Sequence, residues 1–319
     1  MSSLSPEKAR RLIRNAHPGP FDLEAEVLAL DRAGARLLFR GDPEYPVLLE
    51  KVADAPDVLY ALGPLAPAAP LAVVGSRRPT PYGLRMARTL ARGAVKAGLA
   101  VVSGLARGID AAAHQGALEG GGATWAVLGS GLARIYPPEN EPLARRIVDA
   151  GGCLLSEYPM NSSPETWHFP RRNRIVSGLS WATVVVEGEV RSGSLGTAMH
   201  AVGQGRGIFA VPGPADSPLS AAPHQLLRDG AVLTCSIDDV LQELPASCGV
   251  RPGPGGSAAP LRLDGERGKI LESLGSDSQT VESLSRGTGL DLPRLSRILF
   301  AMEMEGLISP FPGQRYGRR

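Results

Sequence analysis

The sequence predicts a doubly wound α/β protein built on a parallel sheet, preceded by a small helical module and followed by a winged-helix domain. Three observations predict it. Between Leu71 and Leu244, short β-rich runs that end in Gly or Ser alternate with helix-like stretches, which is typical of a parallel sheet covered by helices. The stretch from Cys248 to Pro260 is dense in Pro and Gly, as in a flexible linker. Three short amphipathic patterns follow it.

The length of the chain agrees with several domains. With 319 residues and 43% hydrophobic content, the chain can bury a substantial core and hold two or three domains. We expect an N-terminal helical module at residues 1–63, an extended α/β domain at 64–246, a linker at 247–263, and a winged-helix-like domain with a basic tail at 264–319.

Helical periodicity predicts the secondary structure of the N-terminal module and of the C-terminal domain. In the N-terminal module, PEKARRLIRNA and LEAEVLALDRAGARLLF place apolar residues three and four positions apart. After the linker, LISPFPGQRY could form the β-ribbon of a winged helix, and a bare helical docking module is the alternative. The apolar residues of the three helices before that ribbon are Ile270, Leu271 and Leu274; Val281 and Leu284; and Leu295, Ile298, Leu299 and Met302.

Composition excludes several classes of protein. No apolar run approaches the roughly 20 residues that span a bilayer, and the first residues lack the hydrophobic core of a signal peptide. The three cysteines are odd in number and lie far from any CxxC spacing, which argues against disulfides and against a cysteine zinc site. We therefore expect a cytoplasmic protein with no membrane partner.

Motifs of catalysis are missing from the sequence. The five histidines form no HxxxH or HxH pair, and no P-loop, GxSxG or GxGxxG motif occurs, so we expect no catalytic residue, no metal site and no cofactor. Asp110 and His114 lie one helical turn apart. They are either an acid and base pair or an intrahelical packing or capping contact, and the second use is the commoner one.

Glycine and hydroxyl residues follow three of the predicted strands. The carboxyl ends of parallel strands meet at one edge of the sheet, where glycine lets the backbone approach an oxygen-rich ligand and helix N-termini favour negative charge. Between Leu71 and Ile109 the chain also carries seven basic residues and no acidic one. The sequence therefore predicts a phosphate-binding edge. Its candidate residues are Gly75, Ser76, Arg77 and Arg78 after the first strand, Ser103 and Gly104 after the second, and Gly129 and Ser130 after the third.

A basic cluster is predicted at the start of another helix, in HFPRRNRIVSGLS. Cations at a helix N-terminus are unfavourable because of the helix dipole, so an anionic ligand explains the cluster better than helix stability does. Phe169 would either stack on a base or staple the helix. The polar residues of this cluster are Arg171, Arg172, Asn173 and Arg174. Further along, Ser192, Gly193 and Ser194 open a helix and form another candidate backbone nest for an anion.

Seven ordered motifs between Gly41 and Leu233 closely resemble the DNA-processing protein A family: GSRRPTPYG, SGLARGIDAAAHQGAL, VLGSGLARIYPPEN, LLSEYP, FPRRNRIVSGLS, SGSLGTAMHAVGQGR and FAVPGP. The resemblance implies an extended Rossmann-like domain that binds single-stranded DNA, forms homodimers, protects incoming strands and loads the RecA recombinase on them during natural transformation and recombination.

The resemblance also implies a DNA site, and residue by residue this site coincides with the candidates above. Two departures from the family pattern stand out. Thr166 lies where many relatives have a lysine three residues before the phenylalanine, and Ala222 and His224 lie where relatives often have Gly and Asn. The family's site falls on Ser76, Arg77, Gly104, Gly129, Ser130, Phe169, Arg172 and Arg174.

Two rival functions remain open. The Lonely Guy phosphoribohydrolases share a Rossmann-type fold and have a PGGxGTxEE helix start, but SGSLGTAMH carries Met199 and His200 where those enzymes have acids. A duplex-DNA regulator would act through the winged helix. However, the segment from Asp264 to Phe311 holds eight acidic and five basic residues, which is unfavourable for phosphate contacts.

Overall fold

The computed structural model describes residues 22–65, 68–249, 265–274, 279–304, 307–311 and 315–318. The chain divides into two compact units, Met1–Gly253 and Pro254–Arg319. Each unit is built around its own hydrophobic core. In the described part of the chain, no helix combines the length and the apolar character that crossing a membrane requires.

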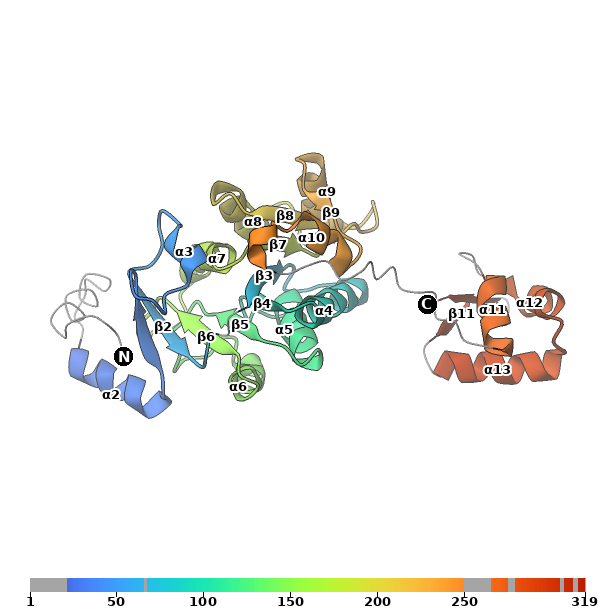
Figure 1. Ribbon diagram of the computed structural model, residues 1–319, viewed down its shortest axis with the longest axis horizontal. Helices are drawn as coiled ribbons and strands as arrows, with labels where there is room; N and C mark the ends of the chain where they lie inside the picture. Colours follow the sequence, from blue (N-terminus) through green and yellow to red (C-terminus); the bar gives the residue numbers. More distant parts are fainter. Residues whose placement is uncertain are drawn as a thin grey trace. The chain divides into compact units, whose positions relative to one another are not determined.

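One nine-stranded sheet organises the first unit (Figure 1). From β3 the chain adds β4, β5 and β6 on one side, and it then returns to add β7, β8 and β9 on the other side. These seven strands are parallel, β2 is antiparallel to β6, and β1 is antiparallel to β2. The direction of strand addition therefore reverses between β3 and β7, which is where doubly wound sheets bind ligands. Across the sheet the strands are β1 (Arg36–Phe39), β2 (Val58–Leu62), β6 (Cys153–Ser156), β5 (Thr124–Val127), β4 (Leu99–Ser103), β3 (Ala69–Val74), β7 (Ala182–Val185), β8 (Gly207–Ala210) and β9 (Val232–Leu233).

Helices cover both faces of this sheet, so alternate strand residues enter different cores. In β3, for example, Ala72 and Val74 pack on one face while Leu71 and Val73 pack on the other. The first face is covered by α3 (Val47–Glu50), α7 (His168–Gly178), α8 (Gly193–Gly203) and α9 (Ala221–Arg228). The second face is covered by α4 (Pro81–Lys96), α5 (Ile109–Glu119) and α10 (Ile237–Glu243), with α6 (Glu141–Asp149) and α2 (Leu23–Ala33) packed in a third cluster. The doubly wound α/β architecture is thus confirmed.

The expectation of a separate helical module at residues 1–63 is wrong for the described residues, because two segments of that range are strands of the main sheet. The apolar pattern LEAEVLALDRAGARLLF forms α2 and then β1. Gly34, with φ +64°, ends the helix in the left-handed conformation that glycine tolerates best. Leu38 and Phe39 are then buried against β2, so pairing and burial outweigh helical periodicity there. The other predicted helix, PEKARRLIRNA, lies outside the described residues, as does most of the predicted linker.

The second unit is a winged helix, as the sequence predicts. A three-stranded antiparallel sheet, in the order β10-β12-β11, lies with three helices around one core. All three predicted groups of apolar residues contribute to that core. Its elements are α11 (Glu266–Leu274), β10 (Gln279–Thr280), α12 (Val281–Thr288), α13 (Leu292–Met304), β11 (Ile308–Phe311) and β12 (Arg315–Arg318).

Candidate nucleic-acid interface

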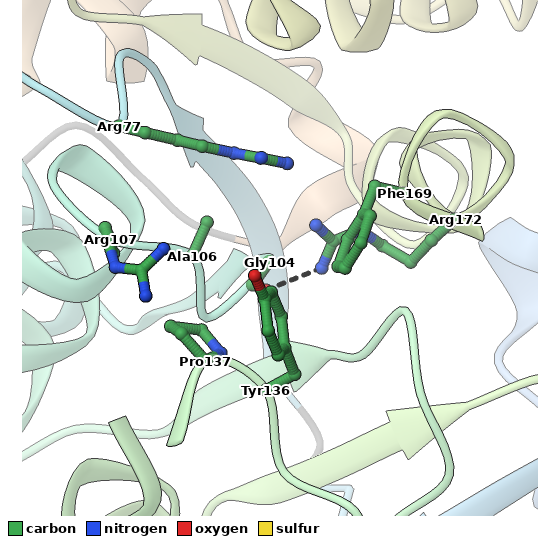
Figure 2. A pocket seen from close by; sticks show the side chains of 8 residues that line it. All are labelled: Arg77, Gly104, Ala106, Arg107, Tyr136, Pro137, Phe169 and Arg172. Carbon is green, nitrogen blue, oxygen red and sulfur yellow. Dashed lines mark hydrogen bonds between the residues drawn. The ribbon is translucent and has the colours of Figure 1, made fainter. Parts of the chain in front are cut away.

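A pocket lies just beyond the carboxyl ends of β3, β4 and β5, next to the switch point of the sheet (Figure 2). Three arginines and two aromatic rings converge there from four separate segments of the chain. Cations with aromatic faces are the combination that binds a nucleic-acid strand, since the cations meet phosphates and the rings stack on bases. The pocket is lined by Arg77, Gly104, Ala106, Arg107, Tyr136, Pro137, Phe169 and Arg172.

The loop after β3 presents Arg77 to the pocket. Gly108, with φ +77°, packs against the backbone of Ser76, and the Ile109 N–H donates to the Ser76 carbonyl at 3.1 Å. A side chain at position 108 would collide with that backbone, so glycine is needed for this close approach. Arg77 is exposed, and its guanidinium carbon lies 5.3 Å from the centroid of the Phe169 ring. The guanidinium is therefore held above an aromatic face and remains open to solvent.

Phe169 belongs to the first turn of α7, where the sequence placed it. Its ring lies 5.5 Å from that of Tyr136, tilted by 45°. A Cβ at Gly129 would meet the Phe169 ring, so the glycine after β5 lets this ring approach the sheet edge. Phe169 is half-buried, between the Tyr136 ring and the Arg77 guanidinium.

Arg172 forms the floor of the pocket and is only 4% exposed. Its Nη1 donates to the Gly104 carbonyl at 2.6 Å and also to the Val127 carbonyl. Burial lowers the pKa of this guanidinium to about 10, and the Asp110 carboxyl opposes that shift. Its Nε has no hydrogen-bond partner among the described residues, which leaves a buried cationic donor unsatisfied beside the pocket.

Four of the lining residues are not among the candidates from the sequence: Ala106, Arg107, Tyr136 and Pro137. They reach the pocket because the loops after β4 and β5 are bound together. The Asn140 side chain donates to the Leu105 carbonyl at 2.8 Å, and Arg107 pairs with Glu139. The sequence signal that could have indicated Tyr136 and Pro137 is the motif ARIYPPEN, which places an aromatic residue and a turn signal after a strand.

Other predicted site residues lie outside the pocket lining. Arg78 is exposed in the loop after β3, and its N–H donates to the Ser76 hydroxyl at 3.0 Å. Ser130 is buried, and its carbonyl accepts from Ser156 at 2.7 Å. Arg174 is 6% exposed and is paired with Glu157.

At the predicted anion nest at the start of α8, the two serine hydroxyls make hydrogen bonds within the nest. The Ser192 hydroxyl accepts from the Leu195 N–H at 3.4 Å and lies 2.9 Å from the Ser194 hydroxyl. The Asn173 amide of α7 donates to the Gly193 carbonyl at 3.1 Å. The last of these contacts joins the second turn of α7 to the start of α8.

The anion position at the start of α4 is occupied by a carboxylate of the chain itself. Glu187 follows β7 and is 5% exposed. It accepts from the Thr80 N–H at 2.9 Å and from the Thr80 hydroxyl at 2.5 Å, and it lies against Gly83. A doubly wound sheet commonly holds a nucleotide phosphate at this first helix N-terminus. Here Glu187 holds that place, so the open cationic pocket lies one strand further along the sheet.

Asp110 and His114 do not make their contacts with each other. The Asp110 carboxylate accepts from the N–H groups of Gly104 and Ala106, at 3.1 and 3.4 Å, and burial raises its pKa. The His114 Nδ1 lies 2.7 Å from the Thr124 hydroxyl, and burial lowers the pKa of the imidazole to about 3. Asp110 therefore caps the loop after β4, while His114 is a buried packing residue.

Comparison with known proteins places this geometry in context. Residues 36–245 match the family described as DNA recombination-mediator protein A, and residues 254–314 match the DprA winged helix domain. The chain is 36% identical to Protein Smf of Escherichia coli over 303 residues, which cover 91% of this chain and 79% of that protein. It is 42% identical to the DNA processing protein DprA of Bacillus subtilis over 205 residues, which cover 63% and 69%.

Two solved structures are similar to the chain. DNA processing protein A from Streptococcus pneumoniae aligns with a TM-score of 0.64 and 39% identity, covering 69% of this chain and 78% of that one. DNA processing protein A from Helicobacter pylori, described for its unique single-stranded DNA binding mode, aligns with a TM-score of 0.59 and 29% identity, covering 66% and 97%.

Proposed function

This chain belongs to the DNA recombination-mediator protein A family, and from that premise we propose that it binds single-stranded DNA without catalysing a reaction. In this proposal it protects an incoming strand and loads the RecA recombinase on it during natural transformation and recombination. The DNA processing protein A of Helicobacter pylori, whose structure is described for its single-stranded DNA binding mode, supports the choice of ligand.

The observation that carries the proposal is the pocket in which Arg77, Arg107 and Arg172 surround the Phe169 and Tyr136 rings. A phosphate accepts charge-assisted hydrogen bonds from guanidinium groups, and an unpaired base stacks on an aromatic ring whatever its sequence. The unsatisfied Nε of Arg172 gives such an anion a buried donor. In a duplex the bases are already stacked on one another, so a ring in a pocket favours a single strand.

The rival enzymatic function has less support. Asp110 and His114 are each bound to other groups, and Glu187 fills the position where a nucleotide phosphate would lie at the start of α4. Met199 and His200, which replace the acids of the phosphoribohydrolase motif, lie in α8. We therefore propose a role in binding, with no catalytic residue.

The test measures the affinity of the chain for a fluorescent oligothymidine and for a blunt duplex at several salt concentrations. We expect tighter binding to the single strand. We also expect the logarithm of the affinity to fall linearly with the logarithm of salt, because phosphate neutralisation releases counterions. Equal affinity for the blunt duplex would contradict the proposal.

Two partners remain to be tested separately. We propose a homodimer, for which light scattering at micromolar concentration should give twice the monomer mass of 33.4 kDa. For RecA, we expect the chain to speed RecA filament formation on strands covered by a single-strand-binding protein. A monomeric mass would refute the first expectation, and an unchanged filament rate would refute the second.

A further inference from the structure

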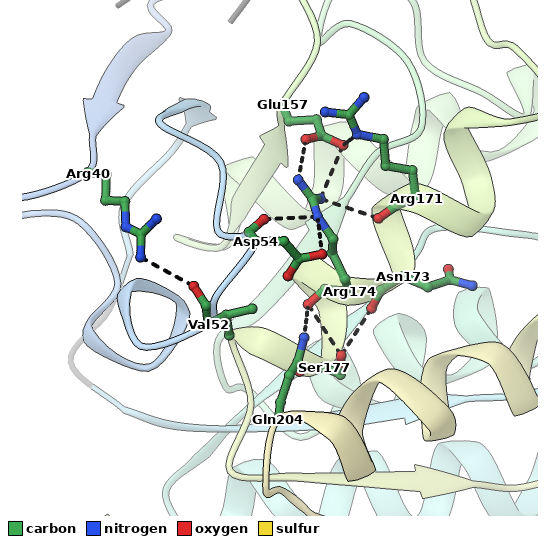
Figure 3. A network of polar contacts seen from close by, with 9 residues as sticks. All are labelled: Arg40, Val52, Asp54, Glu157, Arg171, Asn173, Arg174, Ser177 and Gln204. Atoms are coloured by element: carbon green, nitrogen blue, oxygen red, sulfur yellow. Dashed lines mark hydrogen bonds and ion pairs between the residues drawn. The ribbon is translucent and has the colours of Figure 1, made fainter.

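Arg174, in the second turn of α7, lies at the centre of a polar network (Figure 3). Its side chain is only 8% exposed. Nη2 donates to Glu157 Oε2 at 2.7 Å and Nη1 donates to Glu157 Oε1 at 3.2 Å, so the guanidinium holds this carboxylate with two bonds. The Glu157 side chain is itself 5% exposed.

The remaining donors of Arg174 are also engaged. Nε donates to the Asp54 carbonyl at 3.1 Å and lies 3.2 Å from the Asp54 carboxylate, while Nη1 also donates to the Arg171 carbonyl at 3.3 Å. A guanidinium has five N–H groups, and these bonds use four of them. A phosphate could take the place of Glu157 on Arg174 only by displacing that buried carboxylate, which would leave its charge unpaired.

The network joins three parts of the chain. Arg174 and Arg171 belong to α7, Glu157 directly follows β6, and Asp54 lies in the turn between α3 and β2. Phe169, on the same helix, enters the pocket only one to two turns before Arg174. The network therefore fixes the end of α7 that carries the pocket residues.

Glu157 is shared between two arginines of different exposure. Arg171 Nε lies 3.3 Å from Glu157 Oε1, and the Arg171 side chain is 54% exposed. Within the bidentate pair, Arg174 balances the charge of the buried carboxylate. The Arg171 guanidinium thus stays half-exposed and holds Glu157 through one ion pair alone, so it can also meet a phosphate. Without Arg174, the buried carboxylate would have Arg171 as its nearest cation.

We propose that Arg174 is a positioning residue for the DNA strand: it neutralises Glu157 and so keeps the charge of Arg171 available for phosphate, without touching the strand itself. This inference rests on the proposed single-strand binding. It also changes the role of Arg174, which the sequence alone pointed to as a phosphate contact.

A mutant cycle in the full chain tests the inference, with binding of fluorescent oligothymidine as the readout. The reference is Arg171→Gln, for which we expect weaker binding and a salt slope that is lower by about 0.7, the value for one lost phosphate contact on a single strand. If the wild-type chain shows no salt-dependent binding, the proposed function itself fails, and this inference fails with it.

Given that reference, Arg174→Gln should weaken binding about tenfold, the loss of one charge-assisted contact. Arg174→Gln in a Glu157→Gln background should then cost less than about twofold, because no acidic charge is left to neutralise. A tenfold loss in both backgrounds would mean that Arg174 contacts phosphate, and no loss in either would mean that it has no part in binding. Both outcomes overturn the proposal.

Folding is controlled in two ways. Arg206→Gln is the matched variant, because the Arg206 side chain also donates hydrogen bonds to backbone carbonyls, those of Leu48 and Gly178, but lies outside this network. It should lower the melting temperature without changing binding. If Arg174→Gln alone does not fold, Glu157→Gln and the double variant provide the test. The proposal requires both variants to keep at least about half of the wild-type affinity, and a tenfold loss of affinity in either variant overturns it.

Discussion

The pocket edge of the large sheet and the third helix of the winged helix are both places where proteins commonly meet nucleic acid, yet their chemistry differs. The stretch from Leu71 to Ile109, which supplies two of the loops at the sheet edge, holds seven basic residues and no acidic one, and three arginines line the pocket. In the winged helix, acidic residues outnumber basic ones between Asp264 and Phe311. On α13, Arg294 is paired with Glu266 at 3.0 Å, and Phe300 is 64% exposed.

This difference teaches that a fold associated with DNA does not by itself identify a DNA-binding surface. A winged helix that reads duplex DNA needs cations on its recognition helix, whereas α13 carries an exposed phenylalanine and two arginines, one of them paired with Glu266, in a segment with an acidic excess. The net charge of the whole chain, +2, conceals the contrast between the two regions.

The largest effect is expected from removing two pocket cations together. Arg77→Ala with Arg107→Ala should cost about 3 kcal/mol of single-strand binding energy, and it should lower the salt slope by about 1.4, because two charge-assisted phosphate contacts are lost. Anisotropy titrations at four salt concentrations measure both quantities. The matched pair in the winged helix, Arg294→Ala with Arg297→Ala, should change neither by more than a few tenths of these values. Equal losses from the two pairs would erase the contrast between the regions.

The next effect concerns stability in acid. Burial holds the pKa of His114 near 3, against 6.5 for a free imidazole. Between those values the unfolded chain takes up a proton that the folded chain excludes, so stability is lost as the pH falls. The first unit should lose about 2 kcal/mol of unfolding free energy between pH 6.5 and pH 4.5 from this group. The segment 254–319 contains no histidine, so it lacks this mechanism.

Urea unfolding followed by tryptophan fluorescence isolates the first unit, because all three tryptophans, Trp125, Trp167 and Trp181, belong to it. The pKa of Asp110 is raised by burial and works in the opposite direction, so the comparison must be made with His114→Gln. That variant should lose less stability than the wild type over the same pH range. An identical pH dependence in the two proteins would show that His114 is protonated without cost in the folded state.

A smaller effect is expected from one aromatic ring. Phe169→Ala should weaken single-strand binding by about 1.5 kcal/mol, roughly tenfold, because base stacking on the ring is lost. The salt slope should stay constant, since no phosphate contact changes. Phe300→Ala in the winged helix is the control and should bind like the wild type. If Phe169→Ala lowers only the melting temperature, the ring staples α7 and does not stack on a base.

The sequence predicted the strand ends well because their signal is local. Each parallel strand is buried on both faces and reads as an apolar run, and the glycine after it marks the turn. The positions of Gly104, Gly129 and Phe169 beside the pocket follow from that rule together with the common direction of the strands.

The sequence could not show which arginine of the cluster is free. In RRNR, Arg171, Arg172 and Arg174 look equivalent, yet one is exposed, one bonds backbone carbonyls at the pocket floor, and one holds Glu157. The partners that they meet outside α7 lie 14 to 120 positions away in the chain, so only the tertiary fold separates the three. The mistake over residues 36–39 has a similar origin: β1 is a strand because it pairs with β2, although its own sequence continues a helical pattern.

The smallest effect is expected from deleting residues 253–319. Because the pocket is built wholly from residues of the first unit, the shortened chain should keep its single-strand affinity to within about threefold. The acidic excess of the winged helix gives no reason for a larger loss of affinity. Because a Pro- and Gly-rich linker precedes it in the sequence, the winged helix would contribute through avidity and would not shape the pocket. Arg315, Arg318 and Arg319 are the residues that would account for a modest loss, since a basic tail attracts phosphate.

The measurement is a titration of the shortened chain, with circular dichroism to verify folding and light scattering to verify its mass. Should the shortened chain fold and keep its assembly state but no longer bind, while the isolated segment 261–319 does bind, then the DNA site lies in the winged helix and the contrast between the two regions is the reverse of the one argued above.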